Sequence, residues 1–384
     1  MFTAIVAGMT GLAWVYLLAF RGRFWLALEH DGGTNKPPTQ WPVIAAVVPA
    51  RDEGEVISAS LQSLLAQDYP GLLSVVVVDD DSHDDTATLA VRTAEMHPAR
   101  AMTIVAGRAL PAGWTGKVWA LKQGIAIAER RYRPDFLLLA DADIVHAPDS
   151  VSRLVSLAAA GGYVLTSLMA KLNCESAAER SHVPAFIYFF QMLFPFAWVR
   201  APQRVTAAAA GGCMLIRAEA LRNAGGIETI RNALIDDCAL AKALKAHGPI
   251  WLGLTERVRS IRRYDTFAEM RQMVARSAYA QLGYSPWLLS ATLFGLALVF
   301  IAPPLLAVFA DGSPRLTGLA AWLAMALSFQ PTLRQYRLSP LWGLALPAVT
   351  LLYAVYTLDS AYQHARKRGG QWKGRVYADA PSMQ

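Results

Sequence analysis

Residues 73–86 read Leu73-Ser74-Val75-Val76-Val77-Val78-Asp79-Asp80-Asp81-Ser82-His83-Asp84-Asp85-Thr86. An apolar run without alternation is typical of a strand that is buried on both faces, as in a parallel sheet covered by helices. The five carboxylates that follow would repel one another unless a cation or hydrogen-bond donors offset their charge. A helix N-cap at Ser82 or Asp84 accounts for only one or two of them. The stretch therefore predicts a strand of a parallel α/β sheet that ends at a ligand site.

Two other apolar runs end in the same way. Val43 to Val48 stops at Pro49-Ala50-Arg51-Asp52-Glu53, and Phe136 to Ala140 stops at Asp141-Ala142-Asp143. Between Val48 and Leu73, leucines recur at helical spacing. Since the carboxyl ends of parallel strands meet at one edge of a sheet, we expect one shared site. Asp141 and Asp143 should point to the same side, where they can bind a divalent cation, or one can bind the cation and the other a sugar hydroxyl.

Two further segments carry candidate site residues. Gly113-Trp114-Thr115-Gly116-Lys117 leads into a helix and offers backbone amides and one ammonium to a phosphate or a sugar, although it lacks the spacing of a Walker P-loop. Asp236-Asp237 precedes an Ala-, Leu- and Lys-rich helix. This acidic pair is either an N-cap pair or part of the site.

The composition indicates a membrane protein. Of the 384 residues 54% are hydrophobic and 17% are charged, which argues against disorder and against a wholly soluble enzyme. The net charge is +7, which suits anionic headgroups or phosphate ligands, but no basic stretch has the pattern of a nucleic-acid module. The spacing of Cys174, Cys213 and Cys238 fits neither a metal knuckle nor a disulfide framework.

The apolar excess is concentrated near the two ends of the chain. Phe2 to Phe20 is uncharged and is followed by Arg21, which predicts a retained anchor with the next domain in the cytoplasm. Three more candidate spans are Trp287 to Phe309, Leu316 to Leu333 and Leu338 to Leu358. Three full crossings would place a basic tail outside, against the usual charge rule. We therefore expect one run to fail to cross, either the first, which Pro303 and Pro304 would kink or shorten, or the short second run.

The predicted organisation has five parts. They are an anchor at 1–23, a cytoplasmic catalytic domain at 24–265, an interfacial amphipathic segment at 266–285, spanning helices at 286–360 and a basic tail at 361–384.

Taken together, these motifs resemble the family 2 glycosyltransferases, inverting nucleotide-sugar enzymes with the GT-A fold. The similarity includes Pro49 to Glu53, Val78 to Thr86, Gly116-Lys117 with Ala120-Leu121 and Gly124, Asp141 with Asp143, and Gly211-Gly212 with Asp236-Asp237. The last pair departs from the family, which usually has Glu-Asp there. The Gln-x-x-Arg-Trp motif of processive members is absent, because Gln272 and Arg276 are one residue too far apart.

The resemblance implies a role for each matched residue. Pro49, Arg51, Glu53 and Asp80 would line the base and ribose of the donor, which is expected to be UDP-linked. Lys117 would lie near this donor and Asp141 would touch it. Asp143 would hold Mg²⁺ or Mn²⁺ on the diphosphate. Asp237, beside Asp236, would be the general base.

The expected acceptor is a lipid. Pro184 to Val199 carries aromatic residues on all sides, which suits an interfacial helix, although burial in an ordinary core explains part of the pattern. Six arginines precede the spans, where they could meet anionic headgroups or form a solvated face: Arg257, Arg259, Arg262, Arg263, Arg271 and Arg276. The tail Trp372 to Tyr377 resembles that of the hopanoid-biosynthesis-associated glycosyltransferases, which implies a hopanoid or related polyisoprenoid acceptor and an inner-membrane location. Carotenoid-ester glycosyltransferases have similar tails. The alternatives are a polyprenyl-phosphate sugar synthase and a non-catalytic membrane scaffold.

Overall fold

The computed structural model describes residues 1–33, 35–366, 371–372 and 375–376. Much of the predicted basic tail, including Lys367, Arg368 and Lys373, lies outside the described residues, as do Gly374 and Tyr377 of the tail motif. The central element is an eight-stranded sheet with the order β3-β2-β1-β4-β7-β6-β8-β5. The strands are β1 (Ile44–Ala50), β2 (Leu73–Asp79), β3 (Met102–Ala106), β4 (Phe136–Ala140), β5 (Ile144–His146), β6 (Leu165–Lys171), β7 (Cys213–Arg217) and β8 (Ile250–Ser260).

The three strands expected from the sequence lie next to one another in the sheet. β1 pairs in parallel with β2 on one side and with β4 on the other, so the acidic segments after the three strands meet at one edge. The other half of the sheet is mixed, since β7 runs antiparallel to both β4 and β6. The α/β fold is confirmed, but the sheet is not wholly parallel.

Both faces of the sheet are covered, which explains the unbroken apolar runs. In β1, Ala45 and Val47 pack into one core, whereas Ile44, Ala46 and Val48 pack into the other. The helices of the sheet domain are α2 (Ile57–Leu65), α3 (Thr86–Met96), α4 (Gly116–Tyr132), α5 (Ser150–Gly161), α7 (Phe196–Arg200), α8 (Ala218–Asn223) and α9 (Asp236–Lys245), with a 3₁₀ turn at Ile227–Ile230. Successive side chains of a strand point to opposite faces, so a strand between two helical layers must be apolar throughout.

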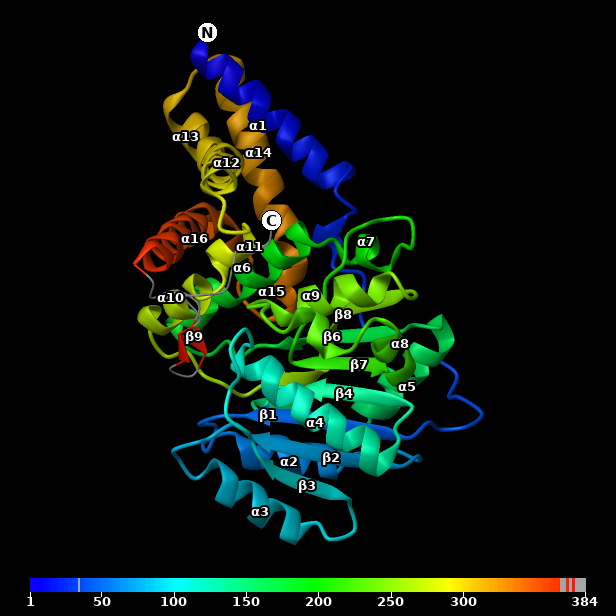
Figure 1. Ribbon diagram of the computed structural model, residues 1–384. Coiled ribbons are helices and arrows are strands. Elements are labelled where there is room, and N and C mark those ends of the chain that lie inside the picture. The colour runs from blue at the N-terminus through cyan, green and yellow to red at the C-terminus, as the bar shows by residue number, and fades with distance from the viewer. Residues whose placement is uncertain (34, 367–370, 373–374, 377–384) are drawn as a thin grey trace.

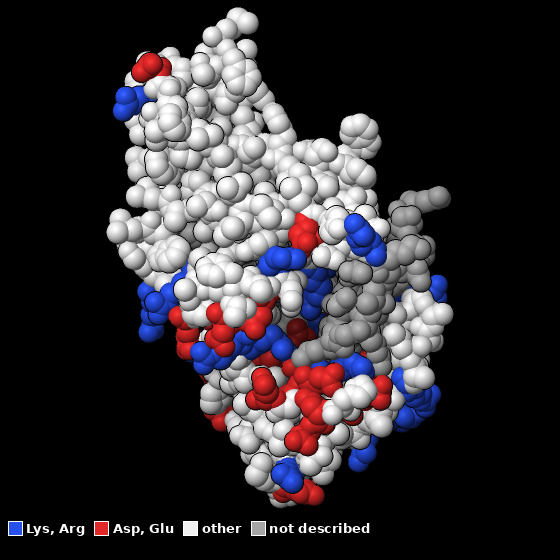
Figure 2. Space-filling model, turned by 90° about the vertical axis from the view of Figure 1, so that its left-hand side faces the viewer, with Lys and Arg blue, Asp and Glu red and all other residues white. Residues whose placement is uncertain are grey.

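A second lobe of helices stands on the sheet domain (Figure 1). It consists of α1 (Phe2–Ala19), α10 (Phe267–Ala275), α11 (Ala278–Gln281), α12 (Pro286–Leu296), α13 (Ala302–Phe309), α14 (Gly312–Ser328), α15 (Gln330–Gln335) and α16 (Trp342–Ala365). A 3₁₀ turn at Phe24–Leu26 leads from α1 to the sheet domain, and the tail carries a short hairpin, β9 (Gln371–Trp372) and β10 (Arg375–Val376). On the face that Figure 2 shows, the upper part of this lobe carries few charged side chains, whereas acidic and basic side chains gather on the sheet domain below it.

Four helices in the described residues are long and apolar enough to cross a membrane. They are Phe2–Ala19, Pro286–Phe309, Gly312–Gln335 and Trp342–Ala365. Pro303 and Pro304 were expected to kink or shorten the second of these, and they do not shorten it. The direction of the helix does change between α12 and α13 (Figure 1). The helix continues for 24 residues because a π-helical segment at Ala297–Ile301 precedes Pro303 and Pro304, which occupy the first turn of α13.

The aromatic segment forms α6 (Ala177–Leu193), which packs between the two lobes. Tyr188 is fully buried there, and its hydroxyl group is 2.7 Å from Ser328 Oγ at the end of α14. Phe186 and Phe190 on the same helix are only partly buried and pack against the sheet-side core. Aromatic residues lie all round α6 because both of its sides have apolar neighbours, the sheet domain and the spanning helices.

Candidate active site

A cavity of about 940 Å³ opens at the carboxyl ends of the central strands. Seven of the nine predicted site residues line it: Pro49, Glu53, Lys117, Asp141, Asp143, Asp236 and Asp237. They come from the ends of β1 and β4 and from the starts of α4 and α9. No residue of the acidic cluster 79–86 lines it, so the expectation of a single shared site is met by the ends of β1 and β4 but not by the cluster after β2.

Arg51 and Asp80 are buried behind the cavity and are absent from its wall. The Arg51 guanidinium donates hydrogen bonds to the carbonyl oxygens of Asp80 and Asp81, the latter at 2.9 Å. The Gly54 amide donates to Asp84 Oδ2 at 2.9 Å. These bonds join the loops after β1 and β2 and supply donors that the acidic cluster requires. The contacts of Arg51 with a donor, and those of Asp80, remain predictions.

Lys117 lies at the centre of the acidic residues. Its Nζ atom is 2.8 Å from Asp141 Oδ1 and 3.3 Å from Asp236 Oδ2. Burial alone would lower the pKa of Lys117, but the carboxylates of Asp141 and Asp236 hold it well above its usual range. The ammonium is therefore a fixed positive charge in the cavity, and its residue lies in the first turn of α4.

Asp237 is positioned by two backbone amides. Oδ2 accepts a hydrogen bond from Gly211 N at 2.9 Å, and Oδ1 accepts one from Cys238 N at 2.7 Å. Burial, and then the like charge of Asp236, raise the pKa of Asp237 to about 6. The N-cap residue of α9 is Ile235, and no side chain caps this helix. The acidic pair is therefore not an N-cap pair, and Asp237 has the pKa of a group that can accept a proton near neutral pH.

The close approach of Lys117 and Asp237 favours a glycine at position 211. A Cβ atom at Gly211 would lie 3.1 Å from Lys117 Nζ and 3.4 Å from Asp237 Oδ2. A side chain at this position would enter the space between the ammonium and the carboxylate.

Asp143 forms an ion pair with a different basic side chain from Asp141. Its Oδ2 atom accepts a hydrogen bond from Ser260 Oγ at 2.7 Å and lies 3.3 Å from Arg262 Nε. The same guanidinium contacts Glu53 Oε2 at 2.5 Å. Burial alone would lower the pKa of Arg262, but Asp143 and Glu53 raise it. The two carboxylates of the Asp-x-Asp motif thus face one cavity but form ion pairs with Lys117 and Arg262 respectively.

The place occupied by the Arg262 guanidinium suits a cation. Carboxylate oxygens are the ligands that Mg²⁺ and Mn²⁺ prefer, and Asp143 and Glu53 supply them here. Within the described residues no group of three or more His, Cys, Asp or Glu side chains is arranged to hold a metal. Asp143 and Glu53 supply two carboxylates of the type that suits a divalent ion, and phosphate oxygens and water would have to supply its other ligands.

Ser260 and Arg262 were not predicted as site residues. Ser260 is the last residue of β8 and Arg262 follows it. β8 pairs with the edge strand β5, which begins directly after Asp143, and only this long-range pairing brings the two residues to the cavity. Whether the six arginines meet headgroups or form a solvated face stays a prediction. Five of them pair with carboxylates of the chain: Arg257 with Asp31 and Asp149, Arg259 with Glu256, Arg262 with Glu53 and Asp143, Arg263 with Asp265, and Arg271 with Asp359.

The far wall of the cavity belongs to the helical lobe. Phe186 and Phe190 of α6 and Met273 of α10 form its apolar part. Polar residues of α10 and α16 form the rest: Glu269, Arg271, Gln272, Asp359 and Gln363. The cavity therefore extends from the carboxylates at the sheet edge to the helices that border the spanning segments.

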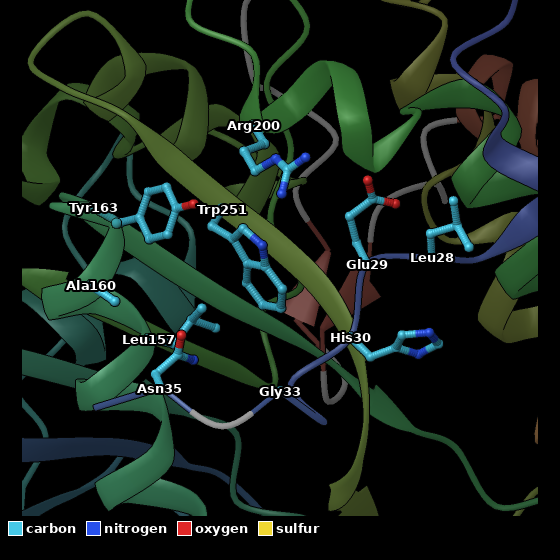
Figure 3. Close-up of a pocket in the computed structure, with 11 residues that line it drawn as sticks. Leu28, Glu29, His30, Gly33, Asn35, Leu157, Ala160, Tyr163, Arg200 and Trp251 are labelled. Atoms are coloured by element: carbon cyan, nitrogen blue, oxygen red, sulfur yellow. The ribbon is translucent and has the colours of Figure 1, made fainter. Parts of the chain in front are cut away.

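A second hollow of about 460 Å³ shares no lining residue with this cavity. It lies between the segment after α1 and the helix α5, and its wall includes His30, Tyr163, Arg200 and Trp251 (Figure 3). None of the nine predicted site residues lines it.

Comparisons with known proteins agree with this geometry. The model of the family described as "Glycosyltransferase like family 2" matches residues 42–280. A stretch of 130 residues is 35% identical to an N-acetylglucosaminyltransferase of Mesorhizobium japonicum (strain LMG 29417 / CECT 9101 / MAFF 303099) and covers 32% of this chain and 28% of that protein. The chain thus spans less than a third of this relative's length.

One solved structure resembles almost the whole chain. It is the mannosyltransferase PcManGT from Pyrobaculum calidifontis in complex with GDP-Man and Mn²⁺. The TM-score is 0.56 at 21% sequence identity, over 93% of this chain and 99% of that one, which supports the likeness of fold. Because the family model matches more than half of the residues, the chain belongs to glycosyltransferase-like family 2 and is a glycosyltransferase with the GT-A fold.

Proposed function

We propose that this glycosyltransferase transfers a sugar from a UDP-linked donor to a hydroxyl group of a membrane lipid, with inversion at the anomeric carbon. The cavity carries this proposal, because its charged end holds the groups that such a transfer needs and its other wall is built by α6, α10 and α16. A hopanoid or related polyisoprenoid alcohol is the acceptor that the sequence resemblance implies. The likeness to the N-acetylglucosaminyltransferase of Mesorhizobium japonicum and to PcManGT, whose structure contains GDP-Man, supports a nucleotide-sugar donor.

In the proposed reaction Asp237 acts as the general base. Its carboxylate accepts the proton of the acceptor hydroxyl group as the oxygen attacks the anomeric carbon, and the bond from that carbon to the diphosphate breaks. The nucleoside diphosphate leaves with the bonding electrons. Two amides fix the carboxylate, and its pKa of about 6 leaves most of it ionised at neutral pH.

The positive side chains stabilise the charge that grows on the leaving group. Lys117 lies in the cavity beside Asp141 and would face the donor, with Pro49 and Glu53 on the same wall. Asp143 would hold Mg²⁺ or Mn²⁺, as the Mn²⁺ in PcManGT supports. When bound, the ion supplies Lewis-acid neutralisation of the diphosphate oxygens.

The proposed location is the inner membrane, with the catalytic domain on the cytoplasmic side. Arg21 and Arg23 follow α1 directly and would lie on the side of the sheet domain. Short segments rich in Lys or Arg remain preferentially in the cytoplasm, which supports this orientation.

The test is transfer by the purified protein in lipid nanodiscs with a panel of UDP-sugars and Mn²⁺, read by mass spectrometry of the lipid and of a water-soluble alcohol. We expect label only in the lipid. Asp237→Asn should lose transfer by at least a hundredfold and still bind the nucleotide, whereas Asp265→Asn, the same change at an exposed residue, should retain it. Equal labelling of the soluble alcohol would disprove the lipid acceptor, and the absence of any turnover would favour the scaffold.

A second candidate is a polyprenyl-phosphate sugar synthase. The observation that favours it is that Arg263 and Arg276 line the cavity near the helical lobe, where they could bind a lipid phosphate. A phosphate oxygen is already ionised and needs little help from a base. Transfer to a polyprenyl phosphate that survives Asp237→Asn would select this candidate over the lipid alcohol.

A further inference from the structure

Helix α16 begins beside the end of α14 that contacts the catalytic domain. A Cβ atom at Gly343 would lie 2.8 Å from Ala326 O, and the Trp322 indole donates a hydrogen bond to Leu344 O at 3.3 Å. Two residues after Ala326, Ser328 is bonded to Tyr188 of α6. The first turn of α16 is therefore in the layer of α6, directly above the sheet domain.

The other end of α16 contacts the same layer. Asp359 accepts a hydrogen bond from Arg271 Nε of α10 at 2.9 Å, and Ser360 Oγ accepts one from Tyr279 N of α11 at 3.0 Å and donates one to Ala275 O. Asp359 also lines the catalytic cavity. In Figure 1, α16 lies at the base of the bundle that α1 and α14 form.

These contacts are incompatible with a crossing. Helix α16 has 24 residues and is therefore about 36 Å long, so a crossing would place its ends on opposite sides of a hydrocarbon core of about 30 Å. Both ends instead contact elements on the catalytic side of the bundle, whereas the turn between α13 and α14 lies at its far end (Figure 1).

We propose that α16 lies in the plane of the membrane surface, with its exposed face against lipid, while α1, α12–α13 and α14 cross. One face of α16 is apolar and exposed along its length: Leu344, Leu351, Val355, Leu358 and Tyr362. The opposite face is buried against the protein: Leu346, Val349, Tyr353, Tyr356 and Ser360. Both faces of α16 are largely apolar, so the exposed face needs an apolar partner, and continuity with the spanning helices identifies that partner as the bilayer. The contacts at its two ends carry the in-plane orientation.

This arrangement resolves the charge conflict seen in the sequence. With three crossings in total, the chain after Ala365 returns to the side of the catalytic domain, where its basic residues are favoured. It also places α16 between lipid and cavity, since Asp359 and Gln363 line the cavity. The inference rests on the membrane placement given under the proposed function and adds which segment does not cross.

Spin labels at exposed positions test the orientation of α16 in nanodiscs. Single cysteines replace Leu344, Leu351 and Leu358 in a chain whose native cysteines are removed, and collision with oxygen and a water-soluble relaxant gives the depth of each label. In an in-plane helix the three depths are equal, whereas in a crossing helix they span about 21 Å over 14 residues. Leu316 and Leu323 of α14, also exposed and seven residues apart, are the matched control and should differ by about 10 Å.

Reporter fusions give a second readout that needs no substitution. Expressed in a bacterium, a green fluorescent protein after Gln384 should fluoresce, and alkaline phosphatase inserted at Gly312 should be active. Active phosphatase after Gln384 together with a depth gradient along α16 would overturn the in-plane helix alone. Equal depths at Leu316 and Leu323 would overturn the membrane placement itself, so the two failures are distinguishable.

Discussion

The pKa of the proposed base predicts a steep pH dependence of transfer. An Asp with its ordinary pKa of 3.8 would be ionised throughout the range from pH 5 to 7, and the rate would be nearly flat. With a pKa of about 6, Asp237 is about one-tenth ionised at pH 5 and about nine-tenths ionised at pH 7. Because only the carboxylate accepts a proton, kcat/KM for the acceptor should rise about tenfold between these two values.

The assay measures nucleoside diphosphate release at saturating donor and Mn²⁺ from pH 5 to 8. Asp236→Asn removes the like charge that contributes to the raised pKa of Asp237, so its profile should shift to lower pH. The Asp236→Asn protein also controls for pH effects on the donor and on the nanodisc, which are the same for both proteins. A flat wild-type profile, or a profile that moves to higher pH in Asp236→Asn, would refute the assignment of Asp237 as the titrating base.

Two further substitutions follow from particular contacts. Arg262→Met removes the guanidinium that neutralises the proposed metal ligand at 3.3 Å. Because a unit charge at this distance is worth about 5 kcal/mol at an effective dielectric of 20, Mn²⁺ affinity measured by electron paramagnetic resonance should rise at least tenfold. Arg263→Met removes the same charge one residue later, and an equal rise there would show a general charge effect instead. Gly124→Ala places a Cβ atom 2.4 Å from a valine of β1, and the overpacking cost of about 1–3 kcal/mol should exceed the gain of about 1 kcal/mol in helix propensity and lower the Tm. Gly8→Ala, with no neighbour within 4 Å, should not lower it, and an unchanged Tm in Gly124→Ala would contradict the packing argument.

The parts of the site that the sequence predicts are those that depend on short segments. A buried strand followed by acidic residues appears as a contiguous pattern, and the parallel pairing of β1 with β2 and β4 then places three such segments at one edge. Asp141 and Asp143 were identified in this way, whereas Asp237 belongs to an acidic pair before a helix and its role was implied by the family resemblance. Arg51 was identified by the same pattern, but its guanidinium is directed at the carbonyl oxygens of the neighbouring loop, which is a contact that no local pattern contains.

The features that the sequence did not predict depend on contacts between distant segments. Arg262 is 119 residues from Asp143 in the chain, and only the pairing of β8 with β5 brings them together. The orientation of α16 is of the same kind, since composition and length alone fit a crossing helix. Contacts with α10, α11 and α14 distinguish the two orientations, and they depend on single polar bonds such as that of Asp359 with Arg271. A hydropathy pattern reports how apolar a helix is, whereas the partners of its few polar side chains determine on which side of the membrane its ends lie.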